Sequence, residues 1–296
     1  MPTTMKTDSG LPHSVSDLIP HRAGMQLIDA LTFFSEDDGT ATLEIRASNL
    51  FVKNDGELDT IVYIELLAQT AAAHSGYKAR FGKGNPKFGF LVGAKDFKTM
   101  GRVVHGQHLT LKIHRDFQME NVTFLDGQVV CGNEVLAQGV LKLWEMPAME
   151  VMPRARVSPA QNQPPFLAFD ESQKTIISSS ELNQKLIKHC TDFRNSTEQN
   201  TAEADFYYSD DFIGFEGHFP DNPIVPGVLM LKTGLLLAEL AAGVSRRIAN
   251  IKSAKFAKTV LPNEGIVYSL SARDNQLRIQ IKSQDSLCAK FTLEIE

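Results

Sequence analysis

Two long apolar stretches stand out in the pattern of hydrophobic and polar positions along the chain. Residues 59–80 read DTIVYIELLAQTAAAHSGYKAR, and the sequence from position 226 reads PGVLMLKTGLLLAELAAGVSRR. Both stretches are too long for a strand and are rich in alanine and leucine, which favour a helix. The pattern therefore predicts two buried helices, one over residues 59–80 and one over residues 226–246.

The residues at the ends of these stretches support the helix predictions. Asp59 or Thr60 is a suitable N-cap for the first helix, which we expect to end near Gly82. Pro226 stands where a helix tolerates proline, in its first turn. We also expect the paired arginines at positions 246–247 to lie near the end of the second helix, where positive charge is favourable.

Alternating polar and apolar residues predict strands around both helices. In the first half these strands cover residues 40–48, 87–98, 106–117, 122–132 and 134–145. In the second half they cover residues 203–209, 250–258, 265–272, 276–282 and 287–295. Each half is therefore predicted to be one long helix followed by a β-meander, a repeat of architecture without sequence identity.

This repeat predicts the fold class and the domain boundaries. A helix that is apolar all round must be covered on every side, and one antiparallel sheet wrapped about it can do this. The hotdog fold is this arrangement, so we predict an α+β double hotdog packed as a pseudo-dimer. The expected segments are a disordered tail over 1–10, a first domain over 11–145, a linker over 146–164 and a second domain over 165–296.

Composition narrows the class of protein further. The chain has 296 residues, 43% of them hydrophobic, and a net charge of −5 with the signs mixed along the sequence, so nucleic-acid binding is not expected. No apolar run approaches the roughly 20 residues of a membrane span, and no signal peptide is evident. Cys131, Cys190 and Cys288 have no CxxC spacing. We therefore expect a cytoplasmic protein.

Three motifs resemble one family. GHFPDNPIVPGV at 217–228 resembles the active-site loop of the hotdog-fold 3-hydroxyacyl-ACP dehydratases, which read roughly GHFPGxPxxPGV. LIPHRAGMQLIDAL at 18–31 is similar to the family's LPHR segment, and IELLAQTAA at 64–72 is similar to its helix with the catalytic acid. Residues 18–145 as a whole resemble the dehydratase-like proteins of aryl-polyene gene clusters.

Each half departs from the family pattern in a complementary way. In this family one unit supplies the histidine and its partner supplies the acid. Fourteen residues after His218 the chain has Lys232, where the family has glutamate or aspartate. The first half has Glu65, but it has no histidine between His21 and His74, and the loop before its helix lacks PxxPG. The resemblance thus implies one complete site, from His218 and Glu65, and an inactive mirror site around Lys232.

The resemblance also implies a reaction. His218 would be the base and Glu65 the acid in dehydration of a 3-hydroxyacyl thioester to the 2-enoyl thioester. The helix beginning at Gly227 would bind the substrate by offering free N–H groups to the thioester oxygen. The implied partner is an acyl thioester on acyl carrier protein or CoA, with no cofactor, no metal and a possible homodimer of chains. The alternatives are a hotdog thioesterase, an enoyl hydratase or a non-catalytic scaffold.

Other polar residues near the motifs have more than one interpretation. Gln69, one turn after Glu65, either orients that carboxyl or makes a plain hydrogen bond between helix and sheet. We interpret His21 and Arg22 as a structural element. We expect His74 to be in the core or at the surface.

The remaining basic residues give weaker signals. His105, His108 and His114 lie in a strand region without a complete set of metal ligands. The basic pairs Arg246–Arg247 and Lys255–Lys258 fit either an acidic carrier and its phosphate or a solvated rim.

Overall fold

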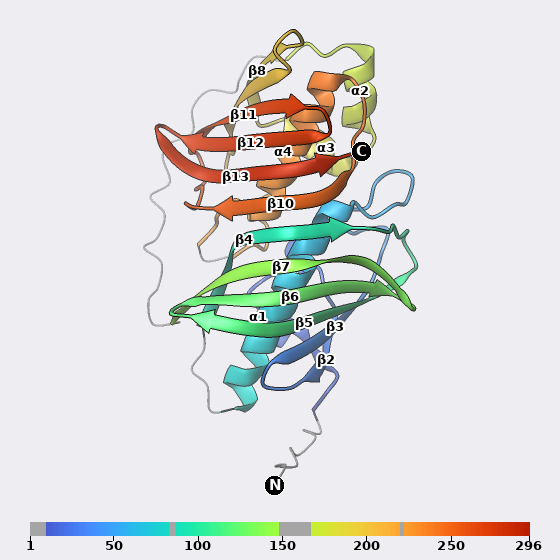
Figure 1. The fold of residues 1–296 in the computed structure, drawn as a ribbon, viewed down its shortest axis with the longest axis vertical. Coiled ribbons are helices and arrows are strands. Elements are labelled where there is room, and N and C mark those ends of the chain that lie inside the picture. The colour runs from blue at the N-terminus through green and yellow to red at the C-terminus, as the bar shows by residue number, and fades with distance from the viewer. Residues whose placement is uncertain (1–9, 83–86, 148–166, 220–221) are drawn as a thin grey trace.

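A computed structural model describes residues 10–82, 87–147, 167–219 and 222–296. Its strands form one 13-stranded sheet in which every pair of neighbours is antiparallel. Figure 1 shows the first-half strands against α1 and the second-half strands against α4, with the two units stacked through their sheets. This arrangement confirms the predicted double hotdog.

Each half has two strands, a long helix and four further strands in this order, with other short elements before them. The first half comprises β1 (His13–Ser14), β2 (Ala30–Phe34), β3 (Asp38–Glu44), α1 (Tyr63–Phe81), β4 (Lys87–Thr99), β5 (His108–Met119), β6 (Val122–Cys131) and β7 (Glu134–Pro147). The second half comprises α2 (Glu171–Ser178), α3 (Glu181–Ile187), β8 (Cys190–Ser196), β9 (Thr201–Tyr207), α4 (Gly227–Ala242), β10 (Ile248–Phe256), β11 (Gly265–Arg273), β12 (Gln276–Ser283) and β13 (Ser286–Ile295). Four 3₁₀ turns complete the described elements: Val15–Asp17, Ala23–Met25, Thr60–Val62 and Ile213–Phe215.

The prediction of a simple meander is wrong for the strand that follows each helix. The sheet order is β1-β2-β3-β5-β6-β7-β4-β10-β13-β12-β11-β9-β8. Because α1 crosses the sheet, the chain leaves β3 and returns at the other end of the first-half strands. There β4 pairs with β7 instead of with β3 or β5. β10 lies beside β13 for the same reason. These two displaced strands pair with each other from Asn250 with Lys98 to Lys255 with Gly93, so they join the two halves.

The first helix begins slightly later than predicted. A 3₁₀ turn over Thr60–Val62 precedes α1, and the side chain of Asp59 caps this turn by accepting from Ile61 N at 3.2 Å. The helix ends at Phe81, close to the predicted Gly82.

The second helix ends four residues earlier than predicted. α4 stops at Ala242 because Gly243 adopts a left-handed conformation with φ of 69°. Arg246 and Arg247 therefore lie beyond the helix, and their predicted place near its last turn is wrong. Pro226 is its N-cap.

Several elements were not predicted from the sequence. β2, β8, α2 and α3 fall where no helix or strand was expected. The predicted linker lies largely, and the predicted tail almost wholly, outside the described residues. None of the helices within the described part of the chain is long and apolar enough to cross a membrane.

Candidate active site

One cavity of about 250 Å³ lies between the two halves. It is lined by both predicted catalytic residues, His218 and Glu65, and by the predicted substrate-binding residue Gly227. The other lining residues that matter below are His21, Ala68, Ala71, Ala72, Ser75, Phe90, Leu91, Leu143, Trp144, Glu145, Phe219, Met230, Phe256 and Lys258. The fold thus brings together residues that are far apart in the sequence.

His218 is held in one orientation by the loop that precedes α4. Its side chain is buried, and Nδ1 lies 3.0 Å from the carbonyl oxygen of Ile224. Because a carbonyl only accepts, Nδ1 carries the hydrogen and Nε2 keeps its lone pair. Burial lowers the pKa of His218 to about 4, and the bond to Ile224 opposes this shift only in part. The imidazole is therefore neutral at neutral pH, with Nε2 as its basic atom.

The histidine loop is docked onto the first half through its backbone. Arg22 N donates to Gly217 O at 2.8 Å. A Cβ at Gly217 would lie 1.9 Å from Arg22 O, and its φ of 95° also favours glycine. The glycine before His218 is therefore required by the close approach of the other half.

Glu65 lies in the first turn of α1 and is 6% exposed. Burial raises its pKa to about 7, although the hydrogen bond from Gln69 Nε2 to Oε1, at 3.0 Å, opposes the shift. Gln69 is itself fixed, because its Nε2 also donates to Met25 O and its Oε1 accepts from Leu27 N. Gln69 thus both orients Glu65 and joins the helix to the chain before β2. The carboxyl keeps its proton up to about neutral pH.

His21 also faces this cavity, which the sequence interpretation missed. Its Nε2 lies 3.7 Å from Glu65 Oε1, and its ring centroid lies 5.4 Å from that of His218. Burial, followed by the charges of His218 and Arg22, lowers the pKa of His21 to about 3. His21 is therefore uncharged at neutral pH, so its contact with Glu65 is not an ion pair. The PHR element was the signal that could have marked His21.

The N-terminus of α4 opens onto the same cavity. Leu229 N and Met230 N both bond to Pro226 O, which leaves the N–H groups of Gly227 and Val228 without an intrahelical acceptor. A Cβ at Gly227 would lie 2.8 Å from the ring of Phe256, so glycine fits here best. This positive helix end can receive an oxygen that gains negative charge.

The rest of the cavity is mostly apolar. Ala68, Ala71, Ala72 and Ser75 have the i, i+3, i+4, i+7 spacing of one face of α1, and all four line it. Their small side chains leave space opposite four larger residues of β4 and β7, namely Phe90, Leu91, Leu143 and Trp144. An apolar chain would fit along this stripe.

The mirror position in α4 is closed by an ion pair. Lys232 Nζ lies 2.7 Å from Asp59 Oδ2, and both side chains are buried. Burial opposes the charge of Lys232, but Asp59 and Glu239 outweigh it and raise the pKa of the ammonium. Lys232 is therefore a buried lysine whose charge is neutralised by the loop that precedes the helix of the other half.

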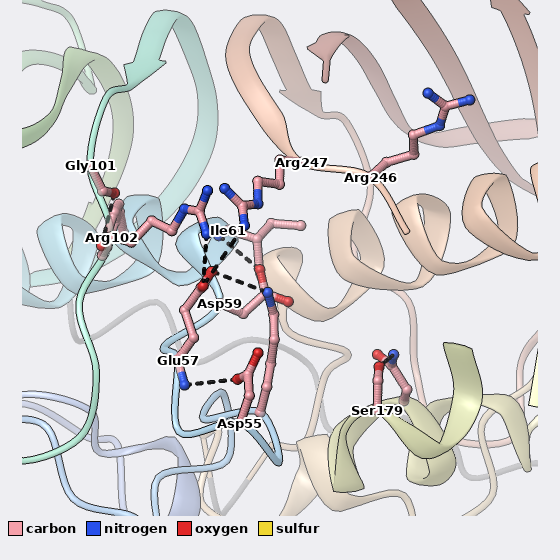
Figure 2. Close-up of polar contacts among 12 residues, drawn as sticks. Asp55, Glu57, Asp59, Ile61, Gly101, Arg102, Ser179, Arg246 and Arg247 are labelled. Atoms are coloured by element: carbon pink, nitrogen blue, oxygen red, sulfur yellow. Dashed lines mark hydrogen bonds and ion pairs between the residues drawn. The ribbon is translucent and has the colours of Figure 1, made fainter. Parts of the chain in front are cut away.

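The surroundings of this pair are highly charged (Figure 2). The carboxylate of Glu57 forms an ion pair with Arg102 at 3.3 Å and lies 3.9 Å from the guanidinium of Arg247, which belongs to the second half. Arg246 N donates to Glu239, and its side chain points away from Glu57 in Figure 2. The two arginines thus border the mirror position, whereas Lys258 borders the main cavity.

The other histidines lie outside the cavity. His74 is buried, bonds to Ser35 O at 2.8 Å and stacks on Phe34, so it is a core residue. His114 pairs with Asp38 at the surface. Among the described residues, no group of three or more histidine, cysteine, aspartate or glutamate side chains is placed to hold a metal ion.

Family models match both halves. Residues 13–153 match the ApeP-like family, described as ApeP dehydratase, and residues 194–292 match the ApeI-like family, described as ApeI dehydratase. The chain belongs to the hotdog-fold dehydratase family. This membership confirms the resemblance seen in the motifs of the two halves.

Curated relatives in the dehydratase family match only part of this chain. The 3-hydroxyacyl-(acyl-carrier-protein) dehydratase FabZ of Lactiplantibacillus plantarum is 40% identical over 57 residues, which is 17% of this chain and 39% of the relative. FabZ of Thermotoga petrophila is 33% identical over 89 residues, 27% of this chain and 64% of the relative. The chain thus spans less than two thirds of the length of these relatives.

Solved structures show the same fold at low identity. The dehydratase domain from the CurF module of curacin polyketide synthase has a TM-score of 0.57 and 11% identity, and the match covers 93% of this chain and 99% of that chain. An acyl-ACP thioesterase from Bacteroides thetaiotaomicron has a TM-score of 0.52 and 10% identity, covering 88% and 98%. Because both are similar, the fold alone does not distinguish dehydration from thioester hydrolysis.

Proposed function

We propose that the protein dehydrates a 3-hydroxyacyl thioester to the 2-enoyl thioester at a single composite site formed by His218 and Glu65. The observation that carries the proposal is one cavity lined by a neutral imidazole from the second half and a carboxyl with a raised pKa from the first. These are the two protonation states that an elimination of water requires.

His218 removes the proton from C2 of the acyl group. Its Nε2 is the free basic atom, because Nδ1 is occupied by Ile224 O. The electron pair of the broken C2–H bond forms the double bond between C2 and C3. The proton stays on His218, which becomes an imidazolium.

Glu65 supplies the proton that makes the hydroxyl a good leaving group. As the C3–O bond breaks, its electron pair leaves with the oxygen, which takes the carboxyl proton and departs as water. The site then holds a charged His218 and a charged Glu65. Transfer of one proton from His218 to Glu65 restores the starting state.

The start of α4 stabilises the charge that develops on the thioester oxygen. The free N–H groups at Gly227 and Val228 are suitable donors, and the helix dipole adds to their effect. One such donor is typically worth about 10²–10³-fold in kcat. Each acid or base partner typically contributes about 10²–10⁴-fold.

The acyl chain lies along the small side chains of α1. We infer a carrier-bound substrate because the curated relatives are named for acyl carrier protein. The reaction belongs in the cytoplasm, where three free cysteines stay reduced.

Thioester hydrolysis fits this site less well. Hydrolysis needs a group that activates water beside the carbonyl carbon, and a carboxyl that keeps its proton is a poor base. Burial raises the pKa of Glu65 to about 7, so below that pH it serves as a donor and not as a base.

A panel of 3-hydroxyacyl thioesters of increasing chain length, on pantetheine, CoA and acyl carrier protein, tests the proposal. Formation of the conjugated enoyl product is followed by its ultraviolet absorbance, and free thiol release is followed in parallel. We expect enoyl product without thiol release, and hydration of the enoyl thioester in the reverse direction. Thiol release without enoyl product would identify a thioesterase instead.

A further inference from the structure

The cavity holds a second imidazole, at His21, that the reaction above does not use. His21 is 6% exposed, and its Nδ1 is buried without a hydrogen-bond partner among the described residues. Its Nε2 faces Glu65 Oε1 at 3.7 Å. Nδ1 thus makes no hydrogen bond that would account for His21 as a structural residue, and Nε2 is the ring nitrogen with a polar neighbour.

The backbone holds His21 firmly in this place. The loop that carries it lies directly on α1, where a Cβ at Gly76 would lie 2.1 Å from Leu18 O. On its other side, Arg22 N is bonded to Gly217 O of the histidine loop. The Arg22 guanidinium also donates to the carbonyl of His21 at 2.7 Å. His21 is therefore fixed to both halves beside both reacting groups.

We propose that His21 is a positioning residue that donates its Nε2–H to Oε1 of Glu65 as this carboxyl gives up its proton. The inference rests on the proposed dehydration. The hydrogen stays on His21, and no bond is formed or broken there. The donor stabilises the carboxylate that appears when the hydroxyl leaves, in a cavity where burial disfavours that charge.

A small movement of either side chain would turn this contact into a hydrogen bond. At 3.7 Å it is longer than a hydrogen bond, as expected while Glu65 is protonated and uncharged. A charged acceptor makes hydrogen bonds shorter and stronger. Gln69 supplies one donor to the same oxygen in the resting state, and His21 supplies a second one when the charge appears.

Two substitutions separate this role from simple packing. His21→Leu removes the donor and keeps an apolar side chain of similar reach. His21→Gln keeps an N–H that can take the place of Nε2–H. With the donor lost, we expect His21→Leu to lower kcat by about 10–100-fold, as for a hydrogen bond to a charged group, with KM nearly unchanged. His21→Gln should retain most of kcat.

The titration of Glu65 gives a readout that packing alone would not change. A donor to the carboxylate lowers the pKa of Glu65, so His21→Leu should raise that pKa and move the alkaline limit of the pH–kcat profile upward. His218, Lys258 and Glu145 also line the cavity, and all three remain in both variants. His21→Gln should leave the alkaline limit near its original position.

The experiment combines kinetics with infrared titration of the Glu65 carboxyl band, identified against Glu65→Gln, in the full chain. A raised pKa of Glu65 in His21→Leu but not in His21→Gln supports the contact. Because this band needs no turnover, it does so even if no enoyl product forms, which would refute only the dehydration. An unchanged pKa of Glu65 in His21→Leu, or equal losses of kcat in both variants, would overturn the role of His21.

Discussion

Removal of the Lys232 ammonium tests whether the mirror position is closed rather than catalytic. Lys232→Met deletes the charge and keeps an unbranched side chain that is one atom shorter. The ammonium lies 2.7 Å from Asp59, with 4% and 10% of the two side chains exposed. The variant leaves Asp59 and Glu239 as buried acids without this partner. Breaking a buried pair in this way costs about 3–5 kcal/mol.

That loss should be visible as a fall in melting temperature. One kcal/mol corresponds to about 2–4 °C for a large domain, so we expect a decrease of roughly 10 °C. The fall should shrink in acid. Burial opposes the charge of Asp59, but Lys232 and Lys53 outweigh it and lower the pKa of this carboxyl below its ordinary 3.8. The stability from this charge is therefore present above about pH 4 and is lost as pH falls through the pKa of Asp59 in the folded state.

The assay is thermal and denaturant unfolding of the wild type, Lys232→Met, Asp59→Asn and the double variant. Asp59→Asn retains an oxygen to cap Ile61 N. We expect the double variant to lose less than the sum of the single losses, because the pair acts as a unit. Lys252→Met is the matched control, since its pair with Glu294 is at the surface and is worth about 0–1 kcal/mol.

Turnover of Lys232→Met at 25 °C should stay within about twofold of the wild type, because the residue does not line the active cavity. A loss of kcat as large as that of His218→Ala, in a folded variant, would refute the reasoning and place the acid in the second half. A melting temperature equal to that of Lys252→Met would refute the buried closure.

Three further outcomes follow from the cavity. As pH increases, kcat should rise near pH 4, where His218 loses its proton, and fall near pH 7, where Glu65 ionises. A kcat that is constant from pH 6 to 9 would contradict the role of Glu65 as the acid. Because burial raises the pKa of Glu65 from 4.5 to about 7, the native state loses stability as pH rises between these values, so Glu65→Gln should be more stable than the wild type at pH 8 by up to about 3 kcal/mol. Unfolding at pH 5 and pH 8 checks this, and an equal difference at both values would contradict it. Ala72→Leu should fill the stripe on α1 and shift preference to shorter acyl groups, as measured by kcat/KM across the thioester panel; an unchanged preference would show that the chain lies elsewhere.

Local patterns in the sequence predicted most elements, but they did not predict which strands are neighbours. Alternation marked β4 and β10 with nearly correct boundaries. It carries no information on pairing partners, so the crossing over the sheet and the β4–β10 junction were missed. The early end of α4 was readable, because Gly243 is a common C-cap residue. The capping box of α2, Asp170 with Gln173, was also readable but was not used.

The motifs predicted that three residues from different parts of the chain would lie together, and their catalytic and binding roles stay predictions. His218, Glu65 and Gly227 do line one cavity, and Lys232 is paired with Asp59 instead of lining it. The convergence of His21 on Glu65 depends on contacts between segments far apart in the chain. The PHR element could mark His21 as a residue of interest, but no local pattern reports that its ring lies beside Glu65.

The measurement that tests the composite site most directly is steady-state kinetics of His218→Ala, Glu65→Gln and the double variant with one 3-hydroxyacyl thioester. Each single variant should lower kcat/KM by about 10²–10⁴-fold. If the two residues act as a unit, the double variant should be no slower than the slower single variant. Full activity in Glu65→Gln, or a double variant whose loss is the product of the two single losses, would contradict the composite site.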